Sequence, residues 1–284
     1  MIDASERARV LIEALPYIKE FRGSTVVVKI GGASLEDLRL RERFAEDLIL
    51  LSWVGIRVVV VHGGGKQISD MLDRVGLKPT FVDGQRVTDQ AALEVVEMVL
   101  GGSLNKEIVR LIQHSGGKAI GITGKDGGMV TAVRRGGTPD LGLVGNVSHV
   151  DASILKHLLE DYIPVVAPLA VSAEGQTLNI NADPFAAALA VALGARKFVL
   201  LSDVEGVRDA KGDLITTLSA RRARELIDDG TIDGGMIPKV QNALDAVDGG
   251  VGKVHIIDGR VEHALLLEVF TNGGVGTQLL RESD

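Results

Sequence analysis

Cysteine is absent from this chain of 284 residues, which excludes disulfide bonds and metal sites with thiolate ligands. No apolar run reaches the ~18 residues that a membrane-spanning helix needs. The N-terminal segment, with Asp3, Glu6 and Glu13, does not have the composition of a signal peptide. We therefore expect a cytoplasmic protein without a membrane partner.

An excess of basic charge is missing as well. The formal net charge is −7 and the pI is near 5.5, whereas nucleic acid favours a basic face on its partner. We therefore expect no nucleic-acid partner, and any anion site must be a local positive pocket on an acidic protein.

Two common nucleotide-binding motifs are also absent. Neither G-x-x-x-x-G-K-[ST] nor G-x-G-x-x-G occurs, and Gly65-Lys66 is followed by Gln67. No Ser-His-Asp order and no His/Glu metal spacing stands out, so we expect no metal held by the chain itself. A phosphate site must therefore use a different cradle.

Glycine, by contrast, is abundant. It accounts for 35 of the 284 residues, or roughly 12%, against ~7% in an average protein. The glycines gather where predicted strands end, so we interpret them as turns and ligand loops.

Short β-branched runs alternate with stretches of helical spacing. The predicted strands lie near 25–30, 57–62, 118–122, 163–168, 197–202 and 253–258. This alternation predicts a largely parallel sheet with helices on both faces, a three-layer αβα sandwich. Two interruptions are typical of hairpins, one at Asp83-Gly84 and one over 129–149.

We divide the chain into residues 1–22, a first lobe of 23–170 and a second lobe of 171–284, with one continuous sheet. Residues 3–21 predict an amphipathic helix that Asp3 caps and Pro16 interrupts and kinks. Its apolar stripe must be buried, on its own subunit or equally well on a neighbour.

Lysines beside glycines are the first candidates for anion binding. Lys29 ends an apolar strand and precedes Gly31-Gly32, and a second strand ends in Gly63-Gly64-Gly65. Lys239 follows glycines at the start of a predicted helix, where free N–H groups favour an anion. A lone lysine is more often a solvated surface charge, an alternative that fits Lys239 better than Lys29.

A second group of candidates lies at Asn179-Ile-Asn-Ala-Asp183-Pro184. Asp183 could simply cap the Ala-rich helix that follows. It could instead orient nearby lysines, with Asn179 and Asn181 presenting polar groups at a strand end. After the strand 197–202, the turn Ser202-Asp203-Val-Glu-Gly206 is a candidate nucleotide loop.

Three further features are less specific. Arg86 follows the Asp83-Gly84 turn, and its planar fork suits a carboxylate, although hairpin arginines are usually exposed. His62 follows four valines and fits a buried structural role better than catalysis. The segment 124–128 is either a lid or a tight turn.

At these residues the chain resembles the N-acetylglutamate kinases of the amino acid kinase family, whose fold is then expected. Seven motifs carry the resemblance, in order: Val28–Gly32, His62–Gly65, Gly84–Thr88, Gly124–Gly128, Asn179–Asp183, Leu200–Gly206 and Gly235–Lys239. It implies ATP-dependent phosphorylation of the side-chain carboxylate of N-acetyl-L-glutamate, in arginine biosynthesis.

The resemblance also implies roles for residues. Lys29 and Lys239 would hold the transferring phosphoryl group from opposite sides, and Asp183 would position both. The residues implied to bind acetylglutamate are Gly64, Gly65, Arg86, Asn179 and Asn181. Those implied to bind phosphate or ATP are Gly31, Gly32, Ser202, Asp203 and Gly206, with Mg²⁺ carried by ATP.

A further layer of the resemblance concerns regulation. The segments 13–18, 265–271 and 274–277 resemble the arginine-inhibited, hexameric branch, in which the N-terminal helix interlaces dimers. This implies a homohexamer, a trimer of dimers. It also implies an arginine pocket lined by Tyr17, His255, Glu268 and Gly274. The segment Ala33-Ser34-Leu35 departs from the branch, which more often has Asn-Ala-Met.

Two alternatives remain. The chain could be another kinase of the family, acting on carbamate, an amino acid carboxylate or a nucleoside monophosphate. It could also be a non-catalytic arginine sensor, although that would require a damaged lysine pair and both lysines are present.

Overall fold

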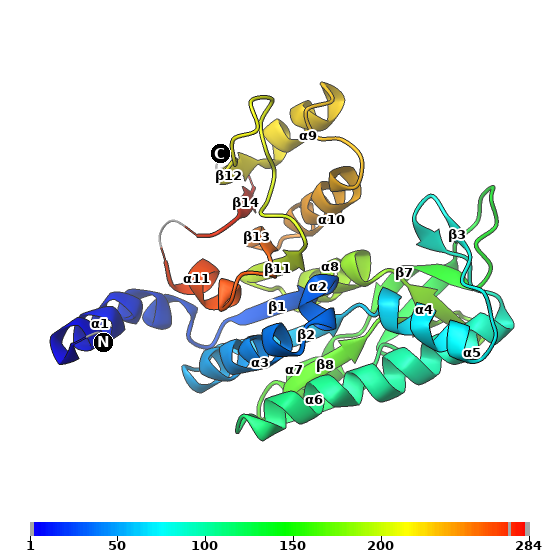
Figure 1. Ribbon diagram of the computed structural model, residues 1–284, viewed down its shortest axis with the longest axis horizontal. Helices are drawn as coiled ribbons and strands as arrows, with labels where there is room; N and C mark the ends of the chain where they lie inside the picture. Colours follow the sequence, from blue (N-terminus) through cyan, green and yellow to red (C-terminus); the bar gives the residue numbers. More distant parts are fainter. Residues whose placement is uncertain (1–2, 272–273, 282–284) are drawn as a thin grey trace.

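The computed structural model describes residues 3–271 and 274–281. Its centre is an eight-stranded sheet in the order β12-β14-β13-β11-β1-β2-β8-β5 (Figure 1). The strands are β1 (Thr25–Ile30), β2 (Arg57–His62), β5 (Ala119–Thr123), β8 (Ile163–Ala167), β11 (Lys197–Ser202), β12 (Thr217–Ser219), β13 (Lys253–Asp258) and β14 (Thr277–Leu280). β14 runs antiparallel to β13 and parallel to β12, and the other neighbours are parallel. The six predicted strands are confirmed to within about one residue, as boundary uncertainty allows.

The β-branched strands feed two cores because successive side chains point to opposite faces of a sheet. In β1, Val26 and Val28 pack into one buried cluster and Val27 into the other. Val58 and Val59 of β2 divide in the same way. The predicted three-layer arrangement is therefore confirmed.

Each face is covered by its own helices. One layer comprises α2 (Ala33–Glu36), α3 (Leu38–Trp53), α4 (Gly65–Arg74), α5 (Gln90–Glu97), the π-helix η1 (Met98–Leu104), α6 (Asn105–His114) and α11 (Ala264–Phe270). The other comprises α7 (Ser153–Leu158), α8 (Ala182–Ala192), α9 (Ala220–Asp228) and α10 (Met236–Asp248). The sheet crosses the boundary expected at residue 170 without a break. The boundary itself stays a prediction.

Both predicted hairpins are present. β3 (Phe81–Val82) and β4 (Gln85–Arg86) flank Asp83-Gly84, where both residues have positive φ. The other hairpin joins β6 (Val130–Arg134) to β7 (Val144–Val150). It closes a small barrel with β9 (Leu169–Val171) and β10 (Thr177–Ile180), which the sequence did not predict.

The N-terminal helix α1 (Ala4–Phe21) extends away from the body of the molecule (Figure 1). Asp3 caps it as predicted, since its carboxylate accepts the Glu6 N–H at 2.8 Å. The predicted interruption at Pro16 is wrong, because one helix runs through that position. The kink at Pro16 stays a prediction. Leu11 of the apolar stripe and its neighbour Ile12 are exposed, so the described residues leave part of this helix uncovered.

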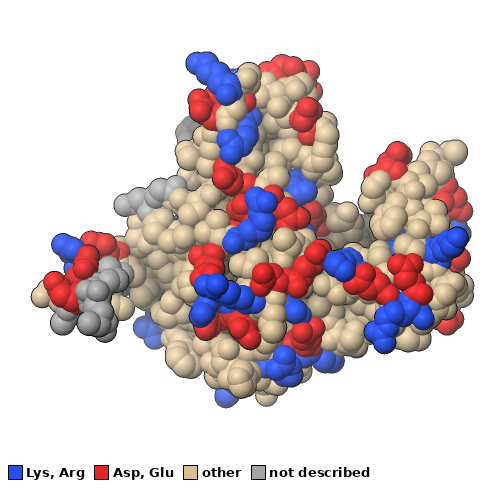
Figure 2. Space-filling view, viewed as in Figure 1, with Lys and Arg blue, Asp and Glu red and all other residues tan. Residues whose placement is uncertain are grey.

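Figure 2 shows the charged side chains on one face of the molecule. Basic and acidic side chains are interspersed there. Among the described residues, no helix combines the length and the apolar character needed to cross a membrane.

Candidate active site

The glycine loops after β1 and β2 lie side by side. Ile30 is in register with His62, and the Gly63 N–H donates to the Ile30 carbonyl at 2.8 Å. This edge is where the carboxyl ends of parallel strands present their loops to a ligand. Together the loops form one wall of a cavity of about 350 Å³, the acceptor cavity.

The acceptor cavity collects most of the predicted substrate residues. Its lining includes Lys29, Gly31, Gly32, Gly64, Gly65, Arg86, Asn179, Asn181 and Asp183. Residues from β1, the loop after β2, β4, β10 and α8 therefore converge, although Lys29 and Asp183 are 154 positions apart in the chain (183 − 29).

An ion pair lies at the centre of this lining. The Lys29 Nζ is 2.8 Å from the Asp183 Oδ1, and both side chains are mostly buried, at 14% and 16% exposure. Gly31 makes room for the ammonium group, because a Cβ there would lie 2.7 Å from Nζ. The structure thus holds a positive charge next to two glycines, as an anion site requires.

The alternative that Asp183 merely caps α8 is wrong. Asn181 is the N-cap, and its side-chain oxygen accepts the Asp183 N–H at 3.0 Å. Because Asn181 satisfies the helix end, the Asp183 carboxylate is available to Lys29.

Arg86 is buried rather than exposed, at 8% exposure. Its Nη2 donates to the Gly65 carbonyl and to the Ser69 hydroxyl, both at 2.8 Å, and its guanidinium lies 4.7 Å from the centre of the Phe81 ring. Nη1 is buried and has no hydrogen-bond partner among the described residues. Burial lowers the pKa of Arg86, but arginine stays charged at neutral pH, so Nη1 is a free donor for an anion.

Two lining residues of the acceptor cavity, Asn179 and Gly64, contact buried side chains of the neighbouring elements. The Asn179 amide donates to the Thr88 hydroxyl at 3.2 Å. Gly64 is closely covered, since a Cβ there would lie 2.6 Å from the Leu100 side chain. A side chain at position 64 would therefore displace the Leu100 and Leu104 side chains.

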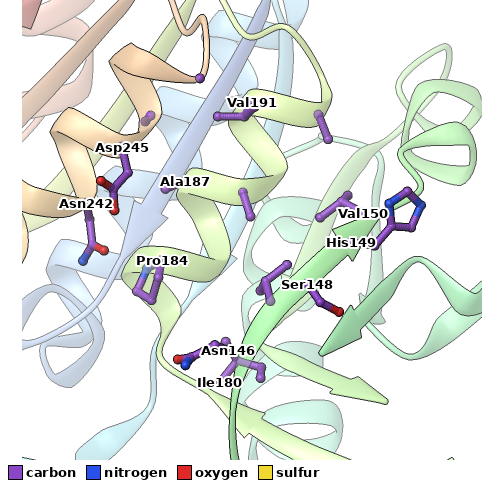
Figure 3. A pocket seen from close by; sticks show the side chains of 15 residues that line it. Asn146, Ser148, His149, Val150, Ile180, Pro184, Ala187, Val191, Asn242 and Asp245 are labelled. Carbon is purple, nitrogen blue, oxygen red and sulfur yellow. The ribbon is translucent and has the colours of Figure 1, made fainter. Parts of the chain in front are cut away.

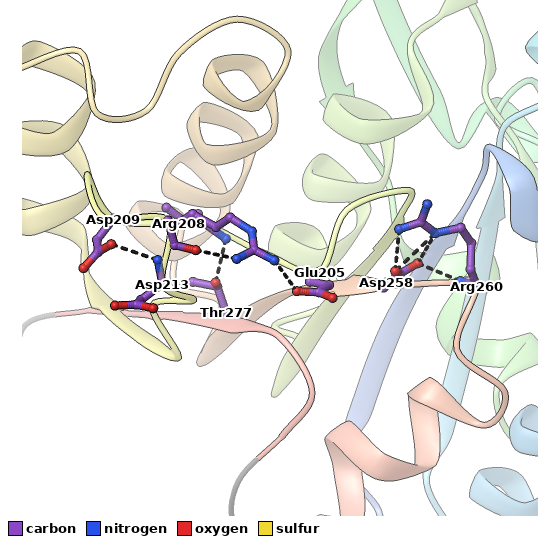
Figure 4. Close-up of polar contacts among 9 residues, drawn as sticks. Glu205, Arg208, Asp209, Asp213, Asp258, Arg260 and Thr277 are labelled. Carbon is purple, nitrogen blue, oxygen red and sulfur yellow. Dashed lines mark hydrogen bonds and ion pairs between the residues drawn. The ribbon is translucent and has the colours of Figure 1, made fainter.

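A second cavity, of about 370 Å³, lies at the carboxyl ends of β11 and β13 and is the candidate nucleotide pocket. Asp203 and Gly206 line it, and Ser202 is buried at the end of β11. Arg208 and Arg260 also line it, and each pairs with a carboxylate, Glu205 or Asp258 respectively (Figure 4). Both are cations that could offset phosphate charge.

Asp203 links the two cavities. Its Oδ1 accepts the Ala33 N–H at 3.0 Å, and a Cβ on Gly32 would collide with its carboxylate. An acidic group, rather than an open amide cradle, therefore lies against Gly32. The phosphate-binding role of Gly31 and Gly32 stays a prediction.

Lys239 lies in the first turn of α10, as predicted, and is partly buried. It does not line the acceptor cavity, and the ion pairs among the described residues do not include it. The structure thus brings Asp183 to one of the two lysines. The meeting of both lysines at one phosphoryl group stays a prediction.

A third cavity, of about 480 Å³, is lined by residues of β7, α8 and α10 (Figure 3). It is unsuited to phosphate chemistry. Its walls are largely apolar, formed by side chains such as Pro184, Ala187 and Val191. Its lining residues include no lysine or arginine. An anionic substrate would find no positive charge there.

The four residues of the predicted arginine pocket also come together. Tyr17, His255, Glu268 and Gly274 line a cavity of about 430 Å³ between α1, β13 and α11. The His255 Nδ1 is 2.6 Å from the Glu268 Oε1, and the Glu268 Oε2 accepts the Val275 N–H at 2.8 Å.

Burial sets the charges in this pocket. It lowers the pKa of His255 despite Glu268 beside it. Burial would raise the pKa of Glu268, but its hydrogen bonds and the nearby Lys197 outweigh this and keep it low. Burial also lowers the pKa of Lys197 to about 8. We therefore assign a neutral His255 that donates from Nδ1 to an ionised Glu268. The buried Nε2 is then an acceptor that has no partner in the part of the chain that the structure describes.

The remaining predictions have simple outcomes. The segment 124–128 is a tight turn, in which the Asp126 carboxylate accepts the Thr123 N–H at 2.6 Å. His62 is fully buried, and burial lowers its pKa to about 4, which favours the structural interpretation. The sequence did not predict that Ser69 and Phe81 contact Arg86 or that Asn105 contacts His62. Asn105 had a signal, since it is a polar residue on an apolar helical stripe.

This fold and this site define a phosphotransferase for a small anionic acceptor: a mostly parallel sheet with glycine loops, a lysine–aspartate pair and a free guanidinium donor. A sequence model described as "Amino acid kinase family" matches residues 24–258. The chain belongs to the amino acid kinase family.

Individual proteins that are similar to this chain include enzymes that act on or make N-acetylglutamate, to judge from their names. The chain is 51% identical to an acetylglutamate kinase of Desulfotalea psychrophila, over 96% of this chain and 97% of the relative. Among solved structures, the N-acetylglutamate synthase of Neisseria gonorrhoeae with coenzyme A and N-acetyl-glutamate has a TM-score of 0.87 at 30% identity. That match covers 98% of this chain, which spans 64% of the synthase. The same synthase with coenzyme A and L-arginine has a TM-score of 0.83 at 28% identity, over 97% of this chain and 66% of the synthase.

Proposed function

We propose that this chain is an acetylglutamate kinase, which transfers the terminal phosphoryl group of ATP to the side-chain carboxylate of N-acetyl-L-glutamate. The products are N-acetylglutamyl 5-phosphate and ADP, and the step belongs to arginine biosynthesis. The curated relatives support the assignment. The observation that carries it is the acceptor cavity, where the Lys29–Asp183 pair lies near a buried arginine with a free Nη1.

The reaction asks little acid–base chemistry of the protein. The acceptor carboxylate is ionised at neutral pH, so its oxygen attacks the γ-phosphorus without a general base. The bond from that phosphorus to the bridging oxygen breaks, and ADP leaves with the electron pair. Both reactants are anions, so the chain must align them and offset their charge.

Each group has a task in this scheme. Arg86 would bind the α-carboxylate of acetylglutamate, with Asn179 beside it. Lys29 would face the transferring phosphoryl group on the acceptor side, and Lys239 would face it from the nucleotide side. Asp183 fixes the direction of the Lys29 ammonium group.

Magnesium would supply charge neutralisation on the phosphates of ATP. Among the described residues there is no cluster of three or more acidic or histidine side chains able to hold a metal ion. In this proposal the ion is therefore held by the nucleotide.

An acceptor panel tests the proposal. ADP release would be measured with N-acetylglutamate, glutamate, carbamate and a nucleoside monophosphate, with and without arginine. We expect release with N-acetylglutamate far above the other three. Preference for another acceptor would assign a different kinase of the family, and no release with any would favour the non-catalytic sensor.

We further propose that arginine inhibits the enzyme by binding in the pocket between α1 and α11. Glu268 and the free Nε2 of His255 are acceptors suited to a guanidinium, and Lys197 is a cation suited to the carboxylate of the amino acid. A structurally similar synthase has been solved with L-arginine, which supports this ligand.

The proposal extends to assembly. Leu11 at 73% and Ile12 at 68% exposure leave an apolar face on α1, and a second copy of the chain would cover it. Because Tyr17 of the same helix lines the pocket, assembly and arginine binding would share one element. We propose a hexamer, a trimer of dimers joined through this helix.

A further inference from the structure

A buried polar pair lies behind the acceptor cavity, outside the groups that touch substrate. His62 is the last residue of β2 and Asn105 the first of α6, and both side chains have 0% exposure. The large majority of buried polar side chains are hydrogen-bonded, because burying one without a partner costs free energy. What they bind therefore shows which part of the fold they hold.

The pair forms a directed chain of hydrogen bonds. The His62 Nδ1 lies 2.8 Å from the Gly63 carbonyl oxygen, which can only accept, so Nδ1 carries the proton. The His62 Nε2 then accepts from the Asn105 amide at 3.1 Å. That amide also donates to the Val165 carbonyl at 2.9 Å. The chain therefore anchors Gly63 to β8, the strand that pairs with β2.

The covalent geometry of the peptide bond carries this anchor into the cavity. In a trans peptide the C=O of one residue and the N–H of the next point in opposite directions. The Gly63 carbonyl is turned inward toward His62, so the Gly64 N–H is turned outward, and Gly64 lines the acceptor cavity. The hydrogen bonds among the described residues give this N–H no partner.

The π-helix holds the same loop from another side. A Cβ on Gly64 would lie 2.6 Å from the Leu100 Cδ2 and 2.9 Å from the Leu104 Cδ2. Both leucines belong to η1, which leads directly into Asn105. π-Helical turns are frequent at functional sites. One element thus supplies both the leucines that confine Gly64 and the amide that orients His62.

We propose that His62 and Asn105 are positioning residues that turn the Gly64 N–H toward the acceptor, so that the loop 63–65 is a preformed donor for the acetylglutamate anion. This inference rests on the proposed function. It assigns the two residues to acceptor binding rather than to phosphoryl transfer or ATP binding.

A pair of His62 variants tests the proposal. In His62→Asn, the amide nitrogen lies as many bonds from Cβ as Nδ1 does and can still donate to the Gly63 carbonyl. His62→Leu has no donor. We expect the KM for N-acetylglutamate to rise about tenfold in His62→Leu, as for the loss of one hydrogen bond to a charged ligand, while the KM for ATP stays unchanged. His62→Asn should restore most of the loss.

Two further variants keep the test decisive. Asn105→Leu should raise the KM for N-acetylglutamate severalfold, and it replaces His62→Leu in the test if that variant does not fold. Asp47→Asn is the matched control, because Asp47 is an equally buried polar residue that pairs with His263 away from the loop. It should leave both KM values unchanged. An unchanged acceptor KM in His62→Leu or, if that variant does not fold, in Asn105→Leu overturns the proposal. An equal rise in both KM values, or no rescue by His62→Asn, overturns it too.

Hydrogen exchange separates this inference from the proposed function. Peptides that cover residues 62–66 should exchange faster in His62→Leu than in His62→Asn, whichever acceptor the enzyme uses. If wild type does not phosphorylate N-acetylglutamate, the proposed function fails and exchange still tests the positioning. If wild type is active and exchange is equal in the two variants, the positioning alone fails.

Discussion

The two sides of the proposed active site are built differently. On the acceptor side, the functional cations Lys29 and Arg86 are mostly buried, and protein groups fix both in direction. On the nucleotide side, Arg208 and Arg260 have side-chain exposures of 54% and 52%, and each pairs with a carboxylate two or three positions before it in the chain. A preorganised cation needs no reorganisation when charge develops on the substrate. The acceptor side is therefore set by the fold, whereas the nucleotide side would be completed by its ligand.

The largest expected effect comes from removing either lysine. Lys29→Ala and Lys239→Ala should each lower turnover by on the order of a hundredfold or more, as for other preorganised charge donors. Lys156→Ala is the control, because Lys156 is exposed and is not among the lining residues of either cavity. The measurement is the steady-state turnover number of each folded variant, compared with that of wild type. Unchanged turnover in Lys239→Ala would remove the nucleotide-side lysine from the scheme and leave the acceptor side alone.

The second effect concerns stability on the acceptor side. Burial lowers the pKa of His62 to about 4, against ~6.5 in the unfolded chain. The unfolded state binds the proton more readily, so the free energy of unfolding should fall as pH falls from about 6.5 to 4, by roughly 3 kcal/mol. Urea midpoints at pH 7 and pH 5 measure the loss, which should be smaller in His62→Asn. The exposed His157→Asn should behave as wild type, and equal pH slopes in all three proteins would contradict a buried neutral imidazole.

A third variant should separate acceptor from nucleotide. Arg86→Lys keeps the positive charge but loses the planar guanidinium group. It therefore also loses the Nη2 that, in wild type, donates to the Gly65 carbonyl and the Ser69 hydroxyl. The KM for N-acetylglutamate should rise about tenfold. The KM for ATP should not change. If both KM values rise together, the two sides are coupled more tightly than the geometry indicates.

The smallest effects should be regulatory. Glu268→Gln removes the carboxylate that faces the proposed guanidinium, so arginine inhibition should weaken severalfold while turnover without arginine is kept. Removal of residues 1–20 should reduce particle size in sedimentation and weaken inhibition as well. A hexamer that survives the truncation intact would contradict the role of α1.

Local sequence predicted much of the site. Runs of valine that end in glycines located β1, β2 and their loops, because strand formation and glycine freedom are local properties. The motifs in their order predicted the amino acid kinase family, which the family match confirmed. Sequence did not predict the burial of Arg86, because Phe81 and Ser69 reach it through a hairpin and a helix that meet only in three dimensions.

By itself, then, the sequence determined six of the eight strands of the sheet, the two glycine loops and the list of groups available for chemistry, since each follows from residue type and short-range spacing. The tertiary structure alone decided which groups meet. It gave the helix cap to Asn181 and so left Asp183 to Lys29. It also set Asn105 behind His62, 43 positions away in the chain. Such contacts depend on packing across the sheet, which no local pattern encodes.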